Sequence, residues 1–135
     1  MNEKANQLIA LISIVDDDQS VREATMSLLK SSGFRTEVFP CAEDFLRSSY
    51  LDQTKCLILD VQMPGMSGLE LHRRLTSEQR FIPIIFISAY DNQEVRKQAM
   101  RSGAIDFLPK PFREDSLLQA IRTALAVTNK TPNYP

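Results

Sequence analysis

The sequence contains few of the side chains from which metal and redox centres are usually built. Its 135 residues include two cysteines and one histidine. Cys41 and Cys56 form no C-x-x-C pair, so we expect both to be reduced thiols that pack as small apolar side chains. The single histidine, His72, excludes mechanisms that need a histidine pair. Its charged neighbours predict a solvated position on a helix.

The sequence also lacks a charge imbalance and a long hydrophobic run. The 16 basic residues are nearly balanced by 17 acidic ones, which excludes the broad basic surface that nonspecific nucleic-acid binding requires. The apolar stretch Leu8–Val15 follows a lysine, as in a signal peptide. However, three aspartates follow it, and it is much shorter than the roughly 20 residues that span a bilayer. We expect a cytoplasmic protein that does not enter a membrane.

The chain length and its hydrophobic content of 43% predict one globular domain. The end of the sequence, TNKTPNYP, is polar and contains two prolines, which is typical of a linker or a tail. We therefore expect an N-terminal tail over residues 1–8, a domain over 9–128, and a linker or tail over 129–135.

Five short segments predict β-strands. The first, third and fourth are largely apolar and rich in β-branched residues, which is typical of parallel strands covered on both faces. The five segments are Leu11–Val15, Thr36–Phe39, Cys56–Leu59, Ile84–Ile87 and Ile105–Leu108.

A segment with helical periodicity follows each predicted strand, which gives five β–α units. Gly33 and Gly103 predict left-handed helix ends after the first and fourth helices. Alternating strands and helices predict an α/β fold with an open parallel sheet between helices, because a closed barrel would need about 250 residues. The apolar helix positions are Val21, Ala24, Leu28 and Leu29; Ala42, Phe45 and Leu46; Leu71 and Leu75; Val95, Ala99 and Met100; and Leu117, Ile121, Ala124 and Leu125.

Polar side chains follow four of the five predicted strands. Asp16–Asp18 come after the first, Asp60 after the third, Ser88 after the fourth and Lys110 after the fifth. The carboxyl ends of parallel strands meet at one edge of a sheet, so we expect these side chains to lie close together. Helix capping would explain any one of the aspartates, but it would not explain Ser88 and Lys110 at the same edge.

This set of side chains suits phosphoryl chemistry. Two close carboxylates repel by about 4 kcal/mol at an effective dielectric constant of 20, so they become protonated or bind a cation. Oxygen ligands alone favour Mg²⁺. A hydroxyl and an ammonium group could hold the oxygens of a phosphoryl group that is transferred to a carboxylate.

Four segments form a specific combination of motifs, and they are IVDDD (Ile14–Asp18), LILDVQMPGMSG (Leu57–Gly68), FISAY (Phe86–Tyr90) and GAIDFLPKPF (Gly103–Phe112). In these motifs the sequence resembles the receiver domains of two-component response regulators, over almost all of residues 10 to 127. The resemblance implies a flavodoxin-like (βα)5 three-layer sandwich whose five-stranded parallel sheet has the order 2-1-3-4-5.

The resemblance also implies a phosphorylation site. Asp60 would accept a phosphoryl group from a phosphohistidine of a sensor histidine kinase or a phosphotransfer protein. Mg²⁺ would be held by Asp16, Asp17, Asp60 and the backbone carbonyl of Gln62. Lys110 would pair with the phosphoryl group, and the Lys110–Pro111 peptide bond would be cis.

Ser88 and Phe107 would form the switch, with Ser88 following the phosphoryl oxygen and Phe107 swinging inward as Ser88 moves. Phe107 replaces the tyrosine that is most common in the family. Asp18 is a third acidic residue and is expected to cap a helix. The basic residues Arg73, Arg74, Arg96 and Lys97 are expected on solvated faces.

A receiver of this kind would catalyse its own phosphorylation and dephosphorylation without turnover of an external substrate. It would control an output domain or a partner, and transcription is the expected output. DNA would be bound only through a domain outside this chain, although a free-standing receiver is an alternative. Phosphorylation is expected to promote dimerisation through the fourth helix, the fifth strand and the fifth helix.

Two other function classes fit less of the sequence. Asp16 and Asp18 make a D-x-D pair, which is typical of haloacid dehalogenase-type phosphatases, with Ser88 and Lys110 as further site residues. That alternative leaves Asp60 unexplained, and its later acidic pair could only be Glu114 and Asp115 in a helix start. A flavin-binding module is disfavoured, because three aspartates after the first strand would repel the flavin phosphate.

Overall fold

The computed structural model describes residues 10–90 and 92–129. Five parallel strands form one sheet of order β2-β1-β3-β4-β5, which confirms the predicted topology. The predicted tails 1–8 and 129–135 lie outside the described residues, apart from Asn129 at the end of the last helix. The strands are β1 (Leu11–Val15), β2 (Arg35–Phe39), β3 (Thr54–Asp60), β4 (Ile84–Ser88) and β5 (Asp106–Pro109).

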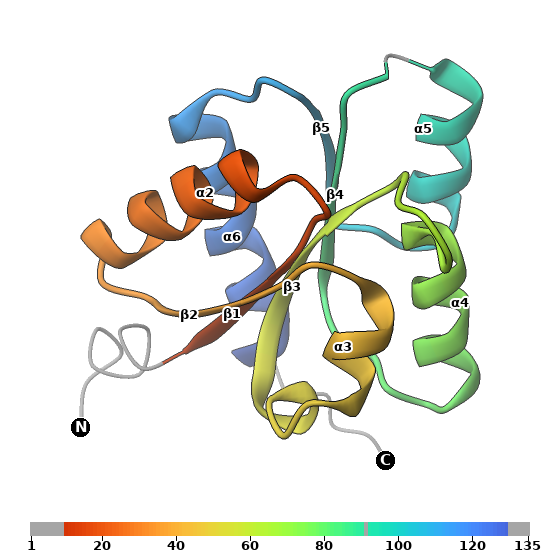
Figure 1. Ribbon diagram of the computed structural model, residues 1–135, viewed down its shortest axis with the longest axis horizontal. Coiled ribbons are helices and arrows are strands. Elements are labelled where there is room, and N and C mark those ends of the chain that lie inside the picture. Colours follow the sequence, from red (N-terminus) through yellow and green to blue (C-terminus); the bar gives the residue numbers. More distant parts are fainter. Residues whose placement is uncertain (1–9, 91, 130–135) are drawn as a thin grey trace.

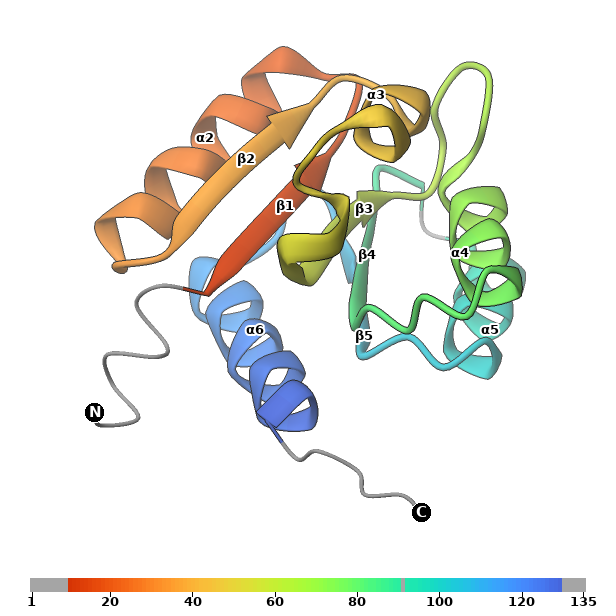
Figure 2. The same ribbon diagram turned by 90° about the horizontal axis from the view of Figure 1, so that it is seen from below.

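Helices cover both faces of the sheet, so the fold is the predicted three-layer sandwich (Figures 1 and 2). Helices α2 and α6 lie on one face, and α3, α4 and α5 lie on the other. The helices are α2 (Gln19–Ser31), α3 (Ala42–Arg47), α4 (Gly68–Ser77), α5 (Gln93–Arg101) and α6 (Glu114–Asn129), and a short 3-10 helix, η1 (Leu51–Gln53), precedes β3.

Each face of the sheet has its own apolar core. On the α2/α6 face, isoleucines of β1, β3 and β4 pack against Leu29, Leu117 and Ile121. On the other face, Leu57, Leu59 and Phe86 pack against residues of α3, α4 and α5, including Phe45, Leu71, Leu75 and Ala99. Because both faces of β1, β3 and β4 are covered, these strands are buried along almost their entire length.

β1 has the predicted bounds, and each of the other strands differs from its predicted bounds by one or two residues at one or both ends. β3 begins at Thr54, because Thr54 is paired with Leu11 and its hydroxyl is bonded to Ser13. β4 includes Ser88, which pairs with Pro109 at the end of β5. Gly33 and Gly103 have φ values of 93° and 97°, which confirms the predicted left-handed helix ends.

The prediction for His72 is wrong. The ring is half-buried against Phe86, with 5.8 Å between the ring centroids, and Nδ1 lies 3.1 Å from the Ser102 hydroxyl. Burial lowers the pKa of His72. The cause is the packing of α4 beside α5, since the Ser102 hydroxyl that contacts His72 belongs to the C-cap residue of α5.

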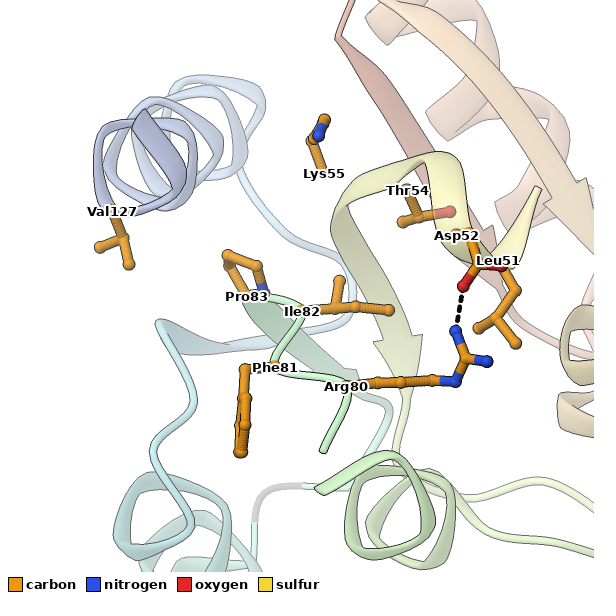
Figure 3. Close-up of a pocket in the computed structure, with 9 residues that line it drawn as sticks. All are labelled: Leu51, Asp52, Thr54, Lys55, Arg80, Phe81, Ile82, Pro83 and Val127. Atoms are coloured by element: carbon orange, nitrogen blue, oxygen red, sulfur yellow. Dashed lines mark hydrogen bonds and ion pairs between the residues drawn. The ribbon is translucent and has the colours of Figure 1, made fainter. Parts of the chain in front are cut away.

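A pocket of about 460 Å³ lies at the amino-terminal edge of the sheet, between the start of β3, the segment before β4 and the end of α6 (Figure 3). Arg80 forms an ion pair with Asp52 beside it. Phe81 and Val127 line the pocket and are exposed to solvent.

Every helix of the described residues is too short or too polar to traverse a lipid bilayer.

Candidate functional site

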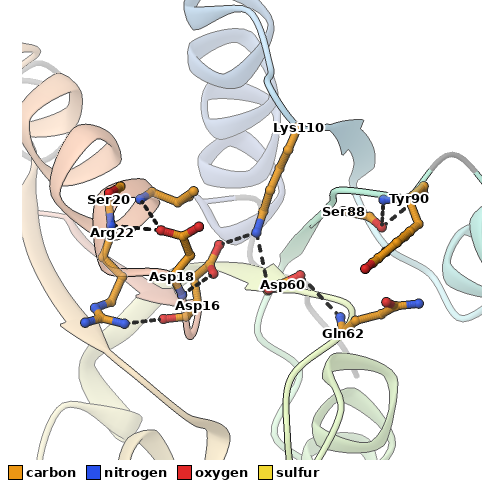
Figure 4. A network of polar contacts seen from close by, with 10 residues as sticks. Asp16, Asp18, Ser20, Arg22, Asp60, Gln62, Ser88, Tyr90 and Lys110 are labelled. Atoms are coloured by element: carbon orange, nitrogen blue, oxygen red, sulfur yellow. Dashed lines mark hydrogen bonds and ion pairs between the residues drawn. The ribbon is translucent and has the colours of Figure 1, made fainter.

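The carboxyl ends of β1, β3, β4 and β5 bring the predicted side chains together at one edge of the sheet (Figure 4). Asp16 and Asp60 are buried, with exposed fractions of 0% and 4%, and Ser88 is also buried. Lys110 reaches between the two aspartates from the segment after β5. The Lys110–Pro111 peptide bond is cis, as predicted.

Lys110 forms ion pairs with two carboxylates. Its Nζ lies 2.8 Å from Oδ2 of Asp16 and 3.3 Å from Oδ2 of Asp60. The contact with Asp60 is also a hydrogen bond. The contact with Asp16 is close, but its angles are not those of a hydrogen bond, so the buried Oδ2 of Asp16 accepts none. The Lys110 ammonium group therefore forms ion pairs with two buried carboxylates but donates a hydrogen bond only to Asp60.

The remaining oxygens are bonded to backbone N–H groups. Oδ1 of Asp16 accepts from the Asp18 N–H at 2.9 Å, and Oδ1 of Asp60 accepts from the Gln62 N–H at 3.2 Å. Arg22 of α2 donates to the backbone carbonyl of Asp16 at 2.7 Å. The first two bonds orient each carboxylate within its own loop, and the third joins α2 to the end of β1.

The electrostatics at Asp60 favour its neutral form. Burial, and after it the charge of Asp16, raises the pKa of Asp60 to about 7, although Lys110 and the Gln62 N–H act in the opposite direction. Burial alone would lower the pKa of Lys110, yet that pKa is raised because the close contacts with Asp16 and Asp60 outweigh burial. The site thus has more negative charge than Lys110 can offset.

Asp16, Asp17 and Asp60 form a cluster that fits a hard cation. One carboxylate oxygen from each lies within 4.8 Å of the other two. Asp17 is exposed, so the cluster opens to solvent on one side. Oδ2 of Asp16 accepts no hydrogen bond, and the Lys110 ammonium group 2.8 Å away is shared with Asp60, so a cation in the cluster would offset charge that Lys110 leaves uncompensated. Carboxylate ligands open to water are the donor set that Mg²⁺ prefers.

Ser88 is in the predicted place, but its hydroxyl is bonded within its own loop. The oxygen accepts from the Tyr90 N–H and donates to the Tyr90 carbonyl, both at 3.1 Å. Figure 4 shows Ser88 and Tyr90 beside the Asp60 cluster. Phe107 is buried, with an exposed fraction of 2%, and lies beside Phe86 in the sheet.

Asp18 does not belong to the carboxylate cluster. Its side chain accepts from the N–H groups of Ser20 and Val21 and caps α2, which confirms the predicted role. This capping also removes Asp18 from the D-x-D pair on which the phosphatase alternative depends. In the segment between β3 and α4, Met63 belongs to the apolar core on the α3, α4 and α5 face, and Met66 packs against that core.

Sequence reasoning did not identify Gly68 as a residue of the site. A Cβ at this position would lie 2.3 Å from the backbone carbonyl oxygen of Asp60, and the Gly68 N–H donates to the Val61 carbonyl at 2.9 Å. The start of α4 therefore approaches the backbone of Asp60 so closely that only glycine fits. The signal was present, since Gly68 is the last glycine of the D-x-x-M-P-G-x-x-G motif.

Arg96 is the second residue that the sequence placed wrongly. We expected a solvated side chain, but Arg96 is half-buried. Its Nη1 donates to the Phe107 carbonyl at 3.1 Å, and its guanidinium carbon lies 4.8 Å from the centre of the Phe107 ring. Arg73, Arg74 and Lys97 are exposed, as expected.

The sequence matches the response regulator receiver domain family over residues 12–122. It is 49% identical to the response regulator protein TmoT of Ectopseudomonas mendocina over 120 residues, which are 89% of this chain and 54% of TmoT. It is 36% identical to the transcriptional regulatory protein FixJ of Bradyrhizobium diazoefficiens, over 84% of this chain and 56% of FixJ.

Among solved structures, the response regulator StyR has the same fold. The TM-score is 0.83 at 47% identity, and the match covers 90% of this chain and 61% of the StyR chain. The chain thus spans about half the length of the curated relatives it matches. These matches give no support to the phosphatase alternative. With the sheet order and the cluster around Asp60, the family match shows that the chain belongs to the response regulator receiver domain family.

Proposed function

We propose that this chain is a phosphorylation-dependent switch in which Asp60 accepts a phosphoryl group from a phosphohistidine of a sensor histidine kinase or a phosphotransfer protein. The observation that supports this most directly is the position of Asp60. Its carboxylate is buried at the end of β3, lies 3.3 Å from the Lys110 ammonium group and belongs to a three-carboxylate cluster.

Asp16, Asp17 and Asp60, with the backbone carbonyl of Gln62, would hold Mg²⁺. When bound, the ion would offset the charge of the carboxylates and polarise the phosphoryl oxygens. The donor set supports this assignment, because it consists of oxygens and its two buried carboxylates share a single ammonium group.

The transfer itself is a displacement at phosphorus. A carboxylate oxygen of Asp60 forms the new P–O bond, and the P–N bond to the donor histidine breaks. The electron pair of that bond goes to the histidine nitrogen. Lys110, already within 3.3 Å of Asp60, pairs with a phosphoryl oxygen. The Ser88 hydroxyl leaves the Tyr90 carbonyl and donates to another phosphoryl oxygen. The chain thereby acts on its own side chain and turns over no external substrate.

An apolar groove beside Lys110 is suited to the protein that donates the phosphoryl group. The groove has a volume of about 240 Å³ and lies between α2 and the segment after β5. Val21 and Leu28 line one wall, and Pro111 and Phe112 line the other. Since Lys110 itself borders the groove, a partner seated there would have its histidine close to Asp60.

We further infer that residues 9–128 are the receiver and that residues 129–135 lead to an output domain. The length of the relatives supports this, because the match covers 54% of TmoT and 56% of FixJ. FixJ is a transcriptional regulatory protein, so DNA binding through an output domain is the output we propose. Homodimerisation through α5, β5 and α6 would accompany phosphorylation in a cytoplasmic protein.

The test is phosphorylation by a small donor. The protein is incubated with acetyl phosphate in Mg²⁺ or in EDTA, and the phosphoryl adduct is measured by intact mass and by its lability to hydroxylamine. We expect labelling only with Mg²⁺, and none in Asp60→Asn. Asp44→Asn is the control, because Asp44 is an exposed carboxylate paired with Arg47 on α3. Labelling of Asp60→Asn at the wild-type level would refute the assignment.

A further inference from the structure

Arg96 joins α5 to β5 through one residue of the sheet. Its Nη1 donates to the Phe107 backbone carbonyl at 3.1 Å, and its guanidinium carbon lies 4.8 Å from the centre of the Phe107 ring. A guanidinium group within about 6 Å of an aromatic ring is attracted to the ring face. One side chain therefore fixes both the backbone and the ring of the same residue.

The residue that Arg96 fixes lies close to Ser88. Phe107 pairs with Phe86 in the sheet, and Ser88 is two residues beyond Phe86 on β4. Because side chains alternate along a strand, Phe86 and Ser88 point to the same face, the face on which α5 packs. The Phe107 ring therefore lies in the core below the Ser88 hydroxyl, and its exposed fraction is 2%.

The ring is buried while the Ser88 hydroxyl is still bonded to Tyr90. Burial of Phe107 therefore does not require Ser88 to have moved toward Asp60. The two Arg96 contacts supply a reason, because both depend on the present position of Phe107. A ring that left the core would give up the guanidinium contact as well as its apolar contacts.

We propose that Arg96 is a positioning residue that holds Phe107 in its buried position and so increases the affinity of the Asp60 site for a phosphoryl group. The inference rests on the proposed function of Asp60 and Ser88. When Ser88 moves toward Asp60, a ring held in the core keeps the region beneath Ser88 filled, whereas a ring that had left the core would leave a cavity there. By holding the ring, Arg96 lowers the cost of the Ser88 movement before phosphorylation takes place.

The first measurement concerns the position of the ring and needs no phosphoryl group. The protein is labelled with 4-fluorophenylalanine, and the Phe107 resonance is assigned as the one missing from Phe107→Leu. We expect Arg96→Met to shift or split this resonance, because methionine keeps part of the alkyl chain and removes both contacts. Lys97→Met is the matched control, since Lys97 is the exposed neighbour on α5. An unchanged Phe107 resonance in Arg96→Met would overturn the proposal.

The second measurement is the affinity for beryllofluoride in the presence of Mg²⁺, followed by the same fluorine spectrum. Arg96→Met should weaken binding about three- to tenfold, the size expected for loss of one cation–π contact and one hydrogen bond. Arg96→Lys should recover part of the loss, and Lys97→Met should bind like the wild type. Equal affinities of Arg96→Met and wild type would refute the coupling. Failure of the wild type to bind beryllofluoride would refute the proposed function, while the first measurement would still decide the position of Phe107.

Discussion

Asp60 is a buried carboxyl group beside a second carboxylate, and this makes the stability of the protein depend on pH. The pKa of Asp60 is raised to about 7 in the folded chain, from 3.8 as its ordinary value. The folded state therefore holds a proton that the unfolded state releases between about pH 4 and pH 7. Stability falls as the pH rises through this range, and the loss is complete above it.

Replacing Asp60 with asparagine should remove this pH dependence. In EDTA, we expect Asp60→Asn to melt several degrees above the wild type at about pH 8, with a much smaller difference at about pH 5. The melting temperatures of both proteins at the two pH values are measured by thermal unfolding, monitored by circular dichroism. Asp44→Asn, which alters an exposed carboxylate, should show no such trend. A constant difference between Asp60→Asn and wild type at all pH values would contradict the assigned pKa.

Gly68 should tolerate no side chain, although its position at the start of a helix would ordinarily accept alanine. A Cβ would lie 2.3 Å from the Asp60 carbonyl oxygen, a backbone atom that cannot move without shifting β3. We expect Gly68→Ala to lower the free energy of unfolding by about 2–3 kcal/mol, measured by urea denaturation. Gly103→Ala is a useful comparison, since no atom lies within 4 Å of its Cβ and only backbone strain opposes the change. A loss for Gly68→Ala no larger than that for Gly103→Ala would show that the close approach is unimportant.

The elements were easier to predict from the sequence than the contacts between them. Continuous apolar runs identified β1 and β4, and the 3.6-residue period identified the helices, because burial on both faces or on one stripe leaves these patterns. The start of β3 was missed because Thr54 and Lys55 are polar, and its pairing with Leu11 has no local signal. Short η1 has too few residues to show a period.

The sequence was sufficient to predict those site residues whose positions depend only on where the strands end. Asp16, Asp60, Ser88 and Lys110 lie at or just beyond the carboxyl ends of four different strands, and parallel topology alone places them at one edge. Arg96 and Arg22 were not predictable, because each donates to a backbone carbonyl of another element. A charged side chain on a helix gives no indication in the sequence of whether it meets solvent or a carbonyl group.

Asp17 and Asp18, which both lie between β1 and α2, should have different roles when each is replaced by alanine. Asp18 caps α2 through the Ser20 and Val21 N–H groups, so Asp18→Ala should destabilise the protein by about 1 kcal/mol. The Asp18→Ala variant should bind Mg²⁺ with an affinity within twofold of that of the wild type. Asp17→Ala should do the reverse, with weaker Mg²⁺ binding by isothermal titration and little change in stability, since Asp17 is exposed in the cluster. Equal loss of Mg²⁺ affinity in both variants would refute the division of roles.

At the scale of the whole molecule, the groove between α2 and the segment after β5 should distinguish protein donors from small ones. Ala24 is an exposed residue that lines this groove, so Ala24→Arg adds bulk there without disturbing the core. We expect phosphotransfer from a phosphorylated histidine kinase to slow by tenfold or more, while labelling by acetyl phosphate is unchanged. The comparison is made by the initial rates of both reactions. Loss of both activities would mean that the substitution damages the Asp60 site itself.

The direction in which the chain runs has a practical consequence for work on this protein. The first strand begins, and the last helix ends, at the edge of the sheet that carries the Phe81 pocket, whereas Asp60 and Lys110 lie at the opposite edge. A domain or label joined before β1 or after α6 therefore leaves the described part of the molecule on the side away from Asp60. Such an attachment should leave the proposed phosphoryl site open to its donor.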